Sequence, residues 1–325
     1  MSLKLKLARA ASWVERRVDS WRWQDKSAPV VVMPYIGYAT PENLLVRGRV
    51  LSNVKADNVR ETQSKWTNFR QMLRLFMTDE VADVTVTAGD YSAVSDEEGY
   101  FTILIPRKLQ TGLVEVEVTT GDTTTVCPVI VPDSEAKFGV ISDIDDTQMQ
   151  TGAFSLARNI WTSLTGNALT RRVFPDAIEL MTLLHEDGRN PVYYVSSSPW
   201  NLHAFLERVF DRAGLPKGPK FLRDYGISET QFITGTHGDH KGSAIDQIMA
   251  AQPDLNFILI GDTGQHDAHV YYDAVTRHEG RVDRVILRAA GPVDQEDMGW
   301  VGRILGKGVP VTVGSDYNEA IAALK

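Results

Sequence analysis

The sequence predicts an all-β sandwich over residues 28–135, followed by a parallel α/β domain over residues 136–325. Residues 81–106 and 112–132 alternate apolar and polar side chains and carry Gly-Asp turns, a pattern typical of half-buried antiparallel strands. Beyond the polar linker PDSEAK, short apolar runs alternate with helical patterns, which is typical of a parallel sheet with helices on both faces. This change of pattern places the domain boundary near residue 135.

The composition is that of a globular protein large enough for two domains. The chain has 325 residues, of which 43% are hydrophobic. Its net charge of −8 argues against nucleic acid as a partner, because no long basic stretch offsets it. The single cysteine, Cys127, excludes an internal disulfide, and its strand-like surroundings predict a buried core thiol. Cysteine usage, the absence of an apolar run of about 18 residues and the absence of a secretory signal predict a cytoplasmic protein.

The N-terminal residues 1–27 are predicted to form a basic amphipathic helix. Residues 1–26 contain seven Lys or Arg against three Asp or Glu, a local charge of +4 on an acidic protein. Apolar side chains, two tryptophans among them, recur there at roughly helical spacing. Such a helix either packs against the body of the protein or lies peripherally on an anionic membrane surface, and the sequence leaves both alternatives open.

One segment of the sandwich domain, residues 58–77, has helical periodicity. Its apolar side chains fall on one face, which predicts an inserted helix packed on the core; they are Val59, Trp66, Phe69, Leu73 and Phe76. The strand and turn pattern of residues 82–105 is similar to that of transthyretin-type β-sandwich modules.

In the second domain, polar groups follow the expected strands. The run FGVIS leads into Asp143, Asp145 and Thr147, VYYV into three serines from Ser196, and FILIG into Asp262 and Asp267, while Lys241 opens a helix. Singly, these residues have ordinary explanations as turns, helix caps or solvated charges. Because the carboxyl ends of parallel strands share one edge of the sheet, we expect them to form one site. Clustered carboxylates favour Mg²⁺, and the hydroxyl and ammonium groups suit a phosphate.

The order Asp-x-Asp-x-Thr, strand-end Ser, Lys and Gly-Asp-x-x-x-x-Asp resembles the haloacid-dehalogenase (HAD) superfamily of phosphohydrolases. The segments SDIDDT, NPVYYVSSSPWNL and HKGSAIDQIMAAQPDLNFILIGDTGQHDAHVY resemble, more narrowly, the family of the actin-patch-associated phosphatidate phosphatase of fungi and its bacterial relatives. The resemblance covers roughly residues 34–51 and 137–290. It implies a HAD-like Rossmannoid catalytic domain with a small helical cap.

The resemblance implies a role for each strand-end group. Asp143 would be the nucleophile that forms an aspartyl-phosphate, Asp145 the general acid and base, and Lys241 the cation that neutralises both phosphate and nucleophile. Thr147 would fix the turn by hydrogen bonding. Ser196, with the backbone N–H of Ser197, would hold phosphate oxygens.

The resemblance also implies a Mg²⁺ site. Its ligands would be Asp143, Asp262, the backbone carbonyl of Asp145 and, directly or through water, Asp267. The cation would relieve the repulsion among these carboxylates. Receiver domains, which accept a phosphoryl group at a similar site, lack the second aspartate that Asp145 supplies here.

The expected substrate is a phosphorylated small molecule or lipid. Residues 148–176 carry an apolar series followed by Arg171 and Arg172, which fits a small helical cap over a substrate with an apolar end and a phosphate head. Alternatively, the apolar face packs on the protein and the two arginines are surface charges. Trp200 is expected to line the pocket. The resemblance implies hydrolysis of phosphatidate to diacylglycerol and phosphate. The alternatives are a soluble phosphomonoesterase and a non-catalytic protein that binds lipid or phosphate.

Overall fold

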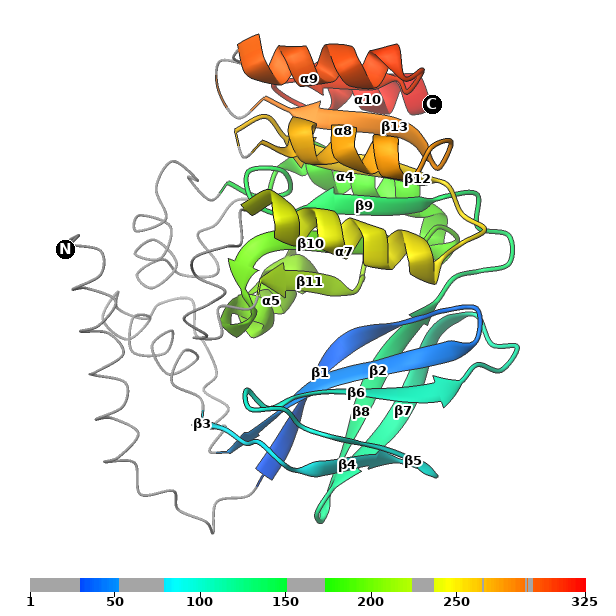
Figure 1. Cartoon of the computed structure of the whole chain (residues 1–325), viewed down its shortest axis with the longest axis vertical. Helices are drawn as coiled ribbons and strands as arrows, with labels where there is room; N and C mark the ends of the chain where they lie inside the picture. Colours follow the sequence, from blue (N-terminus) through cyan, green and yellow to red (C-terminus); the bar gives the residue numbers. More distant parts are fainter. Residues whose placement is uncertain are drawn as a thin grey trace, which may run out of the picture.

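The computed structural model describes residues 30–52, 79–150, 173–223, 237–264, 266–289, 291 and 295–325. Two sheets lie one beside the other, the N-terminal one below the C-terminal one in Figure 1. The predicted N-terminal helix, the inserted helix and the predicted cap, with Arg171 and Arg172, lie outside the described residues.

The N-terminal unit is one strongly curled sheet. Its eight strands are β1 (Val30–Ala39), β2 (Asn43–Ser52), β3 (Asp79–Glu80), β4 (Thr85–Ala88), β5 (Tyr91–Val94), β6 (Tyr100–Pro106), β7 (Gly112–Thr120) and β8 (Thr123–Val131). The order is β3-β2-β1-β8-β7-β4-β5, and β6 also pairs with β2. Strands β5 and β6 contact each other, so the sheet nearly closes around its core. Cys127 is a free, fully buried thiol in that core, as predicted.

The C-terminal unit contains the predicted parallel sheet. Its strands are β9 (Gly139–Asp143), β10 (Val192–Pro199), β11 (Lys220–Arg223), β12 (Phe257–Asp262), β13 (Val282–Arg288) and β14 (Val311–Gly314). The order is β11-β10-β9-β12-β13-β14, and every pair is parallel. This is the doubly wound order, which reverses beside β9 and brings the carboxyl ends of β9, β10 and β12 together.

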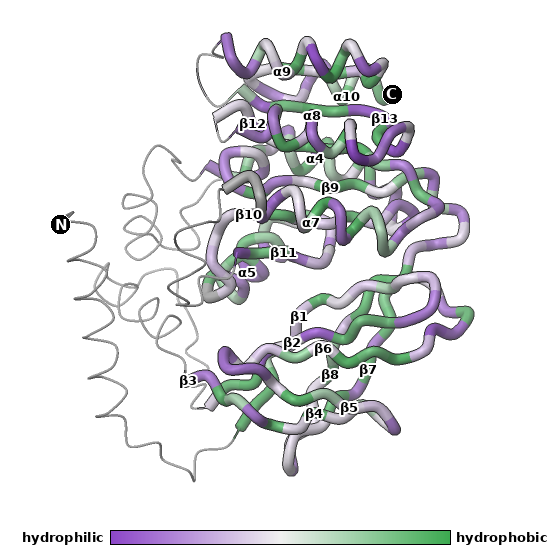
Figure 2. The backbone as a smooth tube through the Cα atoms, viewed as in Figure 1, coloured by the Kyte–Doolittle hydropathy of each residue, from purple (hydrophilic) through white to green (hydrophobic). Residues whose placement is uncertain are grey.

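Helices cover both faces of this sheet. Helices α4 (Pro175–His185), α5 (His203–Ala213) and α10 (Asn318–Leu324) pack on one face, and α7 (His237–Ala251), α8 (Asp267–Arg277) and α9 (Gln295–Gly306) on the other. On β9, Val140 belongs to the first core and Ile141 to the second, because neighbouring side chains point to opposite faces. Hydrophobic segments accordingly run along the strands in Figure 2. Among the described residues, no helix is both long and apolar enough to cross a membrane.

The edge strand β11 was not predicted from the sequence. A strand is expected at QFITGT, residues 231–236, which lie outside the described residues. The structure forms β11 from KFLR, in which Lys220 is buried and pairs with Glu207 of α5 at 2.5 Å. A lysine at the start of so short a run gives no strand signal, and its burial depends on contacts with Glu207, Phe210 and Tyr194 of other elements.

Candidate active site

The turn after β9 presents the aspartates. It is closed by backbone hydrogen bonds, because the N–H groups of Gln148 and Met149 both donate to the carbonyl oxygen of Ile144. Asp146 occupies the left-handed region with φ 57°, which an aspartate tolerates better than most residues. Asp146 N–H also donates to Met149 O at 2.9 Å, so the chain folds back within a few residues. The turn thereby directs Asp143 and Asp145 to the same edge of the sheet.

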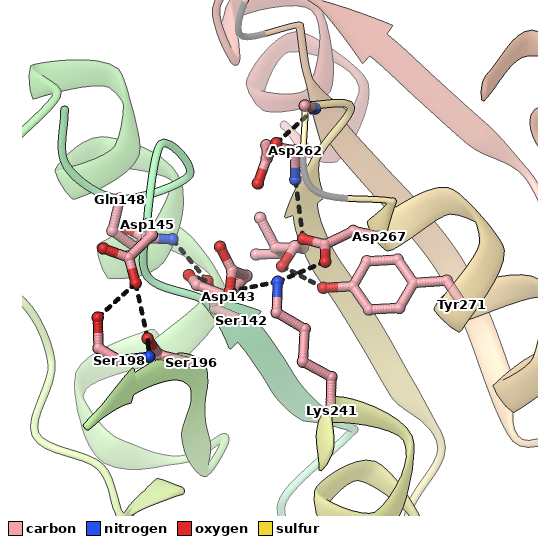
Figure 3. A network of polar contacts seen from close by, with 12 residues as sticks. Ser142, Asp143, Asp145, Gln148, Ser196, Ser198, Lys241, Asp262, Asp267 and Tyr271 are labelled. Atoms are coloured by element: carbon pink, nitrogen blue, oxygen red, sulfur yellow. Dashed lines mark hydrogen bonds and ion pairs between the residues drawn. The ribbon is translucent and has the colours of Figure 1, made fainter. Parts of the chain in front are cut away.

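Three buried carboxylates meet at this edge, as Figure 3 shows. One oxygen each of Asp143, Asp262 and Asp267 lies within 4.8 Å of the others. Asp262 N–H donates to Asp267 Oδ2 at 3.2 Å, and Gly264 N–H donates to Asp262 Oδ1 at 2.5 Å. A Cβ on Gly261 would lie 2.5 Å from Asp267 Oδ2, so this position requires glycine for the close approach of the carboxylate.

Lys241 supplies the positive charge of the site. Its side chain rises from the first turns of α7, is 3% exposed, and donates a hydrogen bond to Asp267 Oδ1 at 2.5 Å. Its Nζ is also 2.8 Å from Asp143 Oδ1. This second contact is an ion pair whose geometry is not that of a hydrogen bond, because Asp143 Oδ1 is buried without a hydrogen-bond donor. One cation therefore serves two carboxylates and leaves the third uncompensated.

Burial perturbs the protonation of these groups. It raises the pKa of Asp143 well above the ordinary value, and the charges of Asp267 and Asp145 add to this, whereas Lys241 opposes it. Burial, with repulsion from Asp267 and Asp143, raises the pKa of Asp262 to about 9. Burial lowers the pKa of Lys241, but the three carboxylates outweigh it and raise the pKa overall. Without a further cation, the carboxylates cannot all be ionised near neutral pH.

The donor set fits a divalent metal ion. Among the described residues, both carboxylate oxygens of Asp143 and Oδ2 of Asp262 are buried without a hydrogen-bond donor. Buried charged oxygens are costly unless something compensates them, and a hard cation is the partner that carboxylates prefer. Asp143, Asp262 and Asp267 can therefore hold the ion. The side chain of Asp145 is not part of this triad.

Asp145 instead faces the serines of β10. Its Oδ2 accepts hydrogen bonds from Ser196 Oγ at 2.7 Å and from Ser198 Oγ at 2.9 Å. The N–H of Ser198 donates to Ser196 Oγ, which fixes the carboxyl end of β10. Ser197 lies between them on β10. Residues 196–198 of this strand end form the serine loop. The structure thus brings together the predicted acid–base residue and the predicted phosphate-binding residues, and it adds Ser198 to them.

The predicted role of Thr147 takes a different form. Its hydroxyl is buried without a partner among the described residues, so it does not close the turn. The backbone carbonyl of Thr147 instead accepts a hydrogen bond from the hydroxyl of Tyr317 at 3.2 Å. No sequence pattern predicted this contact, because Tyr317 lies 170 positions from Thr147, between β14 and α10.

Arg288, at the end of β13, supports the same region and was also missed. Its guanidinium pairs with Asp176 of α4, donates to Ser315 O at 2.9 Å, and lies 4.3 Å from the ring centre of Tyr317. Asp176 Oδ2 also accepts a hydrogen bond from Tyr317 N–H at 2.8 Å. The sequence signal that could have identified this residue is an arginine at the end of an apolar strand.

Trp200 lies outside the carboxylate cluster. Its ring stacks on Tyr35 of the N-terminal sheet at 4.8 Å between ring centres, and Tyr100 lies 5.8 Å away. The expected pocket residue is thus engaged in the contact between the two domains.

Known proteins are similar to the part of the chain that carries these residues. Residues 138–289 match the family model "Phosphatidate phosphatase APP1, catalytic domain". The chain is 28% identical to phosphatidate phosphatase APP1 of Saccharomyces cerevisiae over 150 residues, which cover 46% of this chain and 25% of the yeast protein. It is 26% identical to an uncharacterized protein of Schizosaccharomyces pombe over 231 residues, covering 67% of this chain and 37% of that protein. The chain therefore spans well under half of these two relatives.

Solved structures are less similar. A chain of the Pnkp1/Rnl/Hen1 complex has a TM-score of 0.35 and 13% identity, covering 53% of this chain and 56% of that chain. The strand-end groups all lie within the matched range 138–289. The part of the chain that carries the candidate site is thus similar to the catalytic domain of phosphatidate phosphatase APP1.

Proposed function

We propose that this protein is a Mg²⁺-dependent phosphatidate phosphatase of the HAD type, with Asp143 as its nucleophile. The observation that carries the proposal is the placement of Asp143 beside Lys241 and within the carboxylate triad with Asp262 and Asp267, with Asp145 and its serines nearby. Similarity to the APP1 catalytic domain supports phosphatidate as the substrate.

The first step transfers the phosphoryl group to Asp143. Its carboxylate oxygen attacks phosphorus as the ester P–O bond breaks, while Lys241 balances negative charge on both partners. The hydroxyls of Ser196 and Ser198 turn from Asp145 to the phosphate oxygens. This frees Asp145 Oδ2 to carry the proton that the departing diacylglycerol oxygen takes up.

The second step returns the enzyme to its starting state. Asp145, now ionised, removes a proton from water, and the water oxygen attacks phosphorus so that the Asp143–phosphorus bond breaks and inorganic phosphate leaves. When bound by Asp143, Asp262 and Asp267, Mg²⁺ would offset the negative charge of the carboxylates and of the phosphate. The basic residues 1–26, which lie outside the described part of the chain, are proposed to bring a cytoplasmic enzyme to anionic lipid.

The test is phosphate release from phosphatidate in detergent micelles with Mg²⁺, beside para-nitrophenyl phosphate as a soluble ester. Wild type, Asp143→Asn and the matched surface variant Asp273→Asn are compared. We expect release from phosphatidate in wild type and Asp273→Asn, and none in Asp143→Asn. In Asp145→Asn with para-nitrophenyl phosphate, whose leaving group departs without an acid, a phosphoenzyme that hydroxylamine cleaves is expected to accumulate.

The other outcomes separate the alternatives. Release from the soluble ester alone would leave the mechanism intact and remove the lipid substrate. If neither substrate releases phosphate but phosphate or phosphatidate still binds, the result would favour a non-catalytic protein that binds lipid or phosphate.

A further inference from the structure

The two domains meet through an aromatic cluster that borders the serine loop. In Figure 1, β1 and β2 are the strands of the lower sheet that run beneath β11 and α5. The cluster consists of Tyr35, Tyr38 and Tyr100 from the curled sheet and Trp200, His203 and Phe221 from the parallel domain. Hydrogen bonds flank it, from Gln247 to the hydroxyl of Tyr38 at 2.7 Å and from Gln252 to the carbonyl of Ala39 at 2.6 Å.

Trp200 connects this cluster to the active site. Only Pro199 separates it from Ser198, whose hydroxyl donates to Asp145. The indole is stacked on Tyr35 with an angle of 20° between the ring planes. Because a proline restricts the backbone between the two residues, the position of the indole constrains the position of the serine loop. The curled sheet therefore helps to set where the Ser196 and Ser198 hydroxyls point.

Arg47 is the cation that lies over Trp200 in this cluster, and among the described residues it has no ion pair with a carboxylate. Its guanidinium carbon lies 5.3 Å from the ring centre of Trp200, 5.0 Å from that of Phe221 and 5.7 Å from that of Tyr38. Its Nη1 is buried with no hydrogen-bond acceptor among the described residues. Burial lowers its pKa, which reflects the cost of a poorly hydrated charge.

Other contacts must compensate the desolvation of this guanidinium. Buried cations are normally paired with carboxylates, but the favourable contacts of Arg47 are with ring faces, of which the indole is the strongest cation partner. Arg47 also stands directly opposite Tyr35 in the pairing of β1 with β2. Tyr35 and Arg47, adjacent on the curled sheet, thus both hold the indole of Trp200.

We infer that Arg47 is a positioning residue, which acts through Trp200 to hold the serine loop in the orientation that binds phosphate. The curled sheet then belongs to the working active site, although Arg47 and Tyr35 lie outside the range matched by the family model. The inference rests on the proposed phosphatase function, because it takes the serine hydroxyls as phosphate ligands.

The experiment measures binding of inorganic phosphate to the full chain by calorimetry in the presence of Mg²⁺, together with kcat and KM. Arg47→Met keeps much of the aliphatic length and removes the charge. We expect phosphate to bind about 2- to 30-fold more weakly, the range for loss of a cation–π contact, and KM to rise by a similar factor. Arg47→Lys should restore part of the loss, because an ammonium still meets the ring faces.

Two readouts separate positioning from a general structural effect. The affinity for Mg²⁺ should not change in Arg47→Met, because the carboxylates come from β9, β12 and α8. Arg303→Met is the matched control: Arg303 lies 4.2 Å from the ring centre of Trp300 on α9, so the same kind of contact is removed away from the serines. Its phosphate affinity should equal that of wild type.

The outcomes are distinct. Wild-type phosphate affinity in Arg47→Met, or an equal loss of Mg²⁺ affinity and thermal stability, would overturn the inference. If Arg47→Met does not fold, Arg47→Lys and Tyr35→Leu decide, since Tyr35→Leu removes the stacked ring and should weaken phosphate binding in the same direction. If the wild-type protein neither binds phosphate nor releases it from a substrate, the proposed phosphatase function itself would be refuted.

Discussion

Replacing Asp262 by asparagine is expected to stabilise the metal-free protein while abolishing activity. Asparagine has nearly the same shape, and its Oδ1 can accept the hydrogen bond that Gly264 N–H donates to Asp262 Oδ1. Its uncharged amide also removes the repulsion between this position and the buried carboxylate of Asp143. The substitution therefore removes a buried acid without leaving a cavity.

The size of the effect follows from the protonation of Asp262. The pKa of this fully buried group is raised from 3.8 to about 9, so the folded protein keeps a proton that the unfolded chain releases. At about 1.36 kcal/mol per unit, the interval from 3.8 to pH 7 corresponds to about 4 kcal/mol of lost stability. Below pH 3.8 both states hold the proton and the cost vanishes, so it grows as the pH rises toward 9.

The assay is urea unfolding in EDTA at several values between pH 5 and pH 8.5. The free energy of unfolding of Asp262→Asn should exceed that of wild type by about 4 kcal/mol at pH 7, and the difference should widen with pH. Added Mg²⁺ should stabilise wild type and leave the variant unchanged, because the variant lacks a ligand. Asp273→Asn, whose side chain is 45% exposed, should show neither effect.

The reasoning would be refuted by a variant that is no more stable than wild type at pH 7 in EDTA. A stability difference that stays constant across the pH range would refute it equally, since it would show that the carboxylate is not held protonated.

Three further predictions concern the same site. Lys241→Met removes the cation shared by Asp143 and Asp267 and should destabilise the protein by roughly 3–5 kcal/mol in urea unfolding, with Mg²⁺ recovering part of the loss; an unchanged midpoint would contradict it. Tyr317→Phe removes the hydrogen bond to the Thr147 carbonyl and should cost about 0.5–1.5 kcal/mol and lower kcat, without changing Mg²⁺ affinity; a wild-type kcat would count against the contact. Because the raised pKa of Asp262 means that metal binding must displace a proton, Mg²⁺ should bind more tightly and release fewer protons as the pH rises toward 9, and calorimetry showing constant affinity from pH 6 to pH 8.5 would argue against this.

Much of the candidate site follows from local sequence. A parallel strand is an apolar run, and the residues that follow it emerge at the carboxyl edge of the sheet, so Asp143, Ser196 and Asp262 could be placed together before the strand order was known. The alternation of strands and helices likewise predicted the parallel sheet, because each element carries its own periodicity. The strand Lys220–Arg223 escaped this reasoning, since its burial depends on Glu207 of another element.

The tertiary structure decided the contacts that join distant parts of the chain. The hydrogen bond from Tyr317 to Thr147 spans 170 positions, and the stacking of Tyr35 on Trp200 joins two domains. Periodicity cannot report such pairs, because it describes one element at a time. The sequence by itself determined which groups lie at the strand ends and hence the chemistry available there. Only the packing of the elements determined that Asp145 faces two serines, that one lysine is shared by two carboxylates, and that Arg47 and Tyr35 of the curled sheet lie against Trp200. Each of these depends on distances between side chains from separate elements.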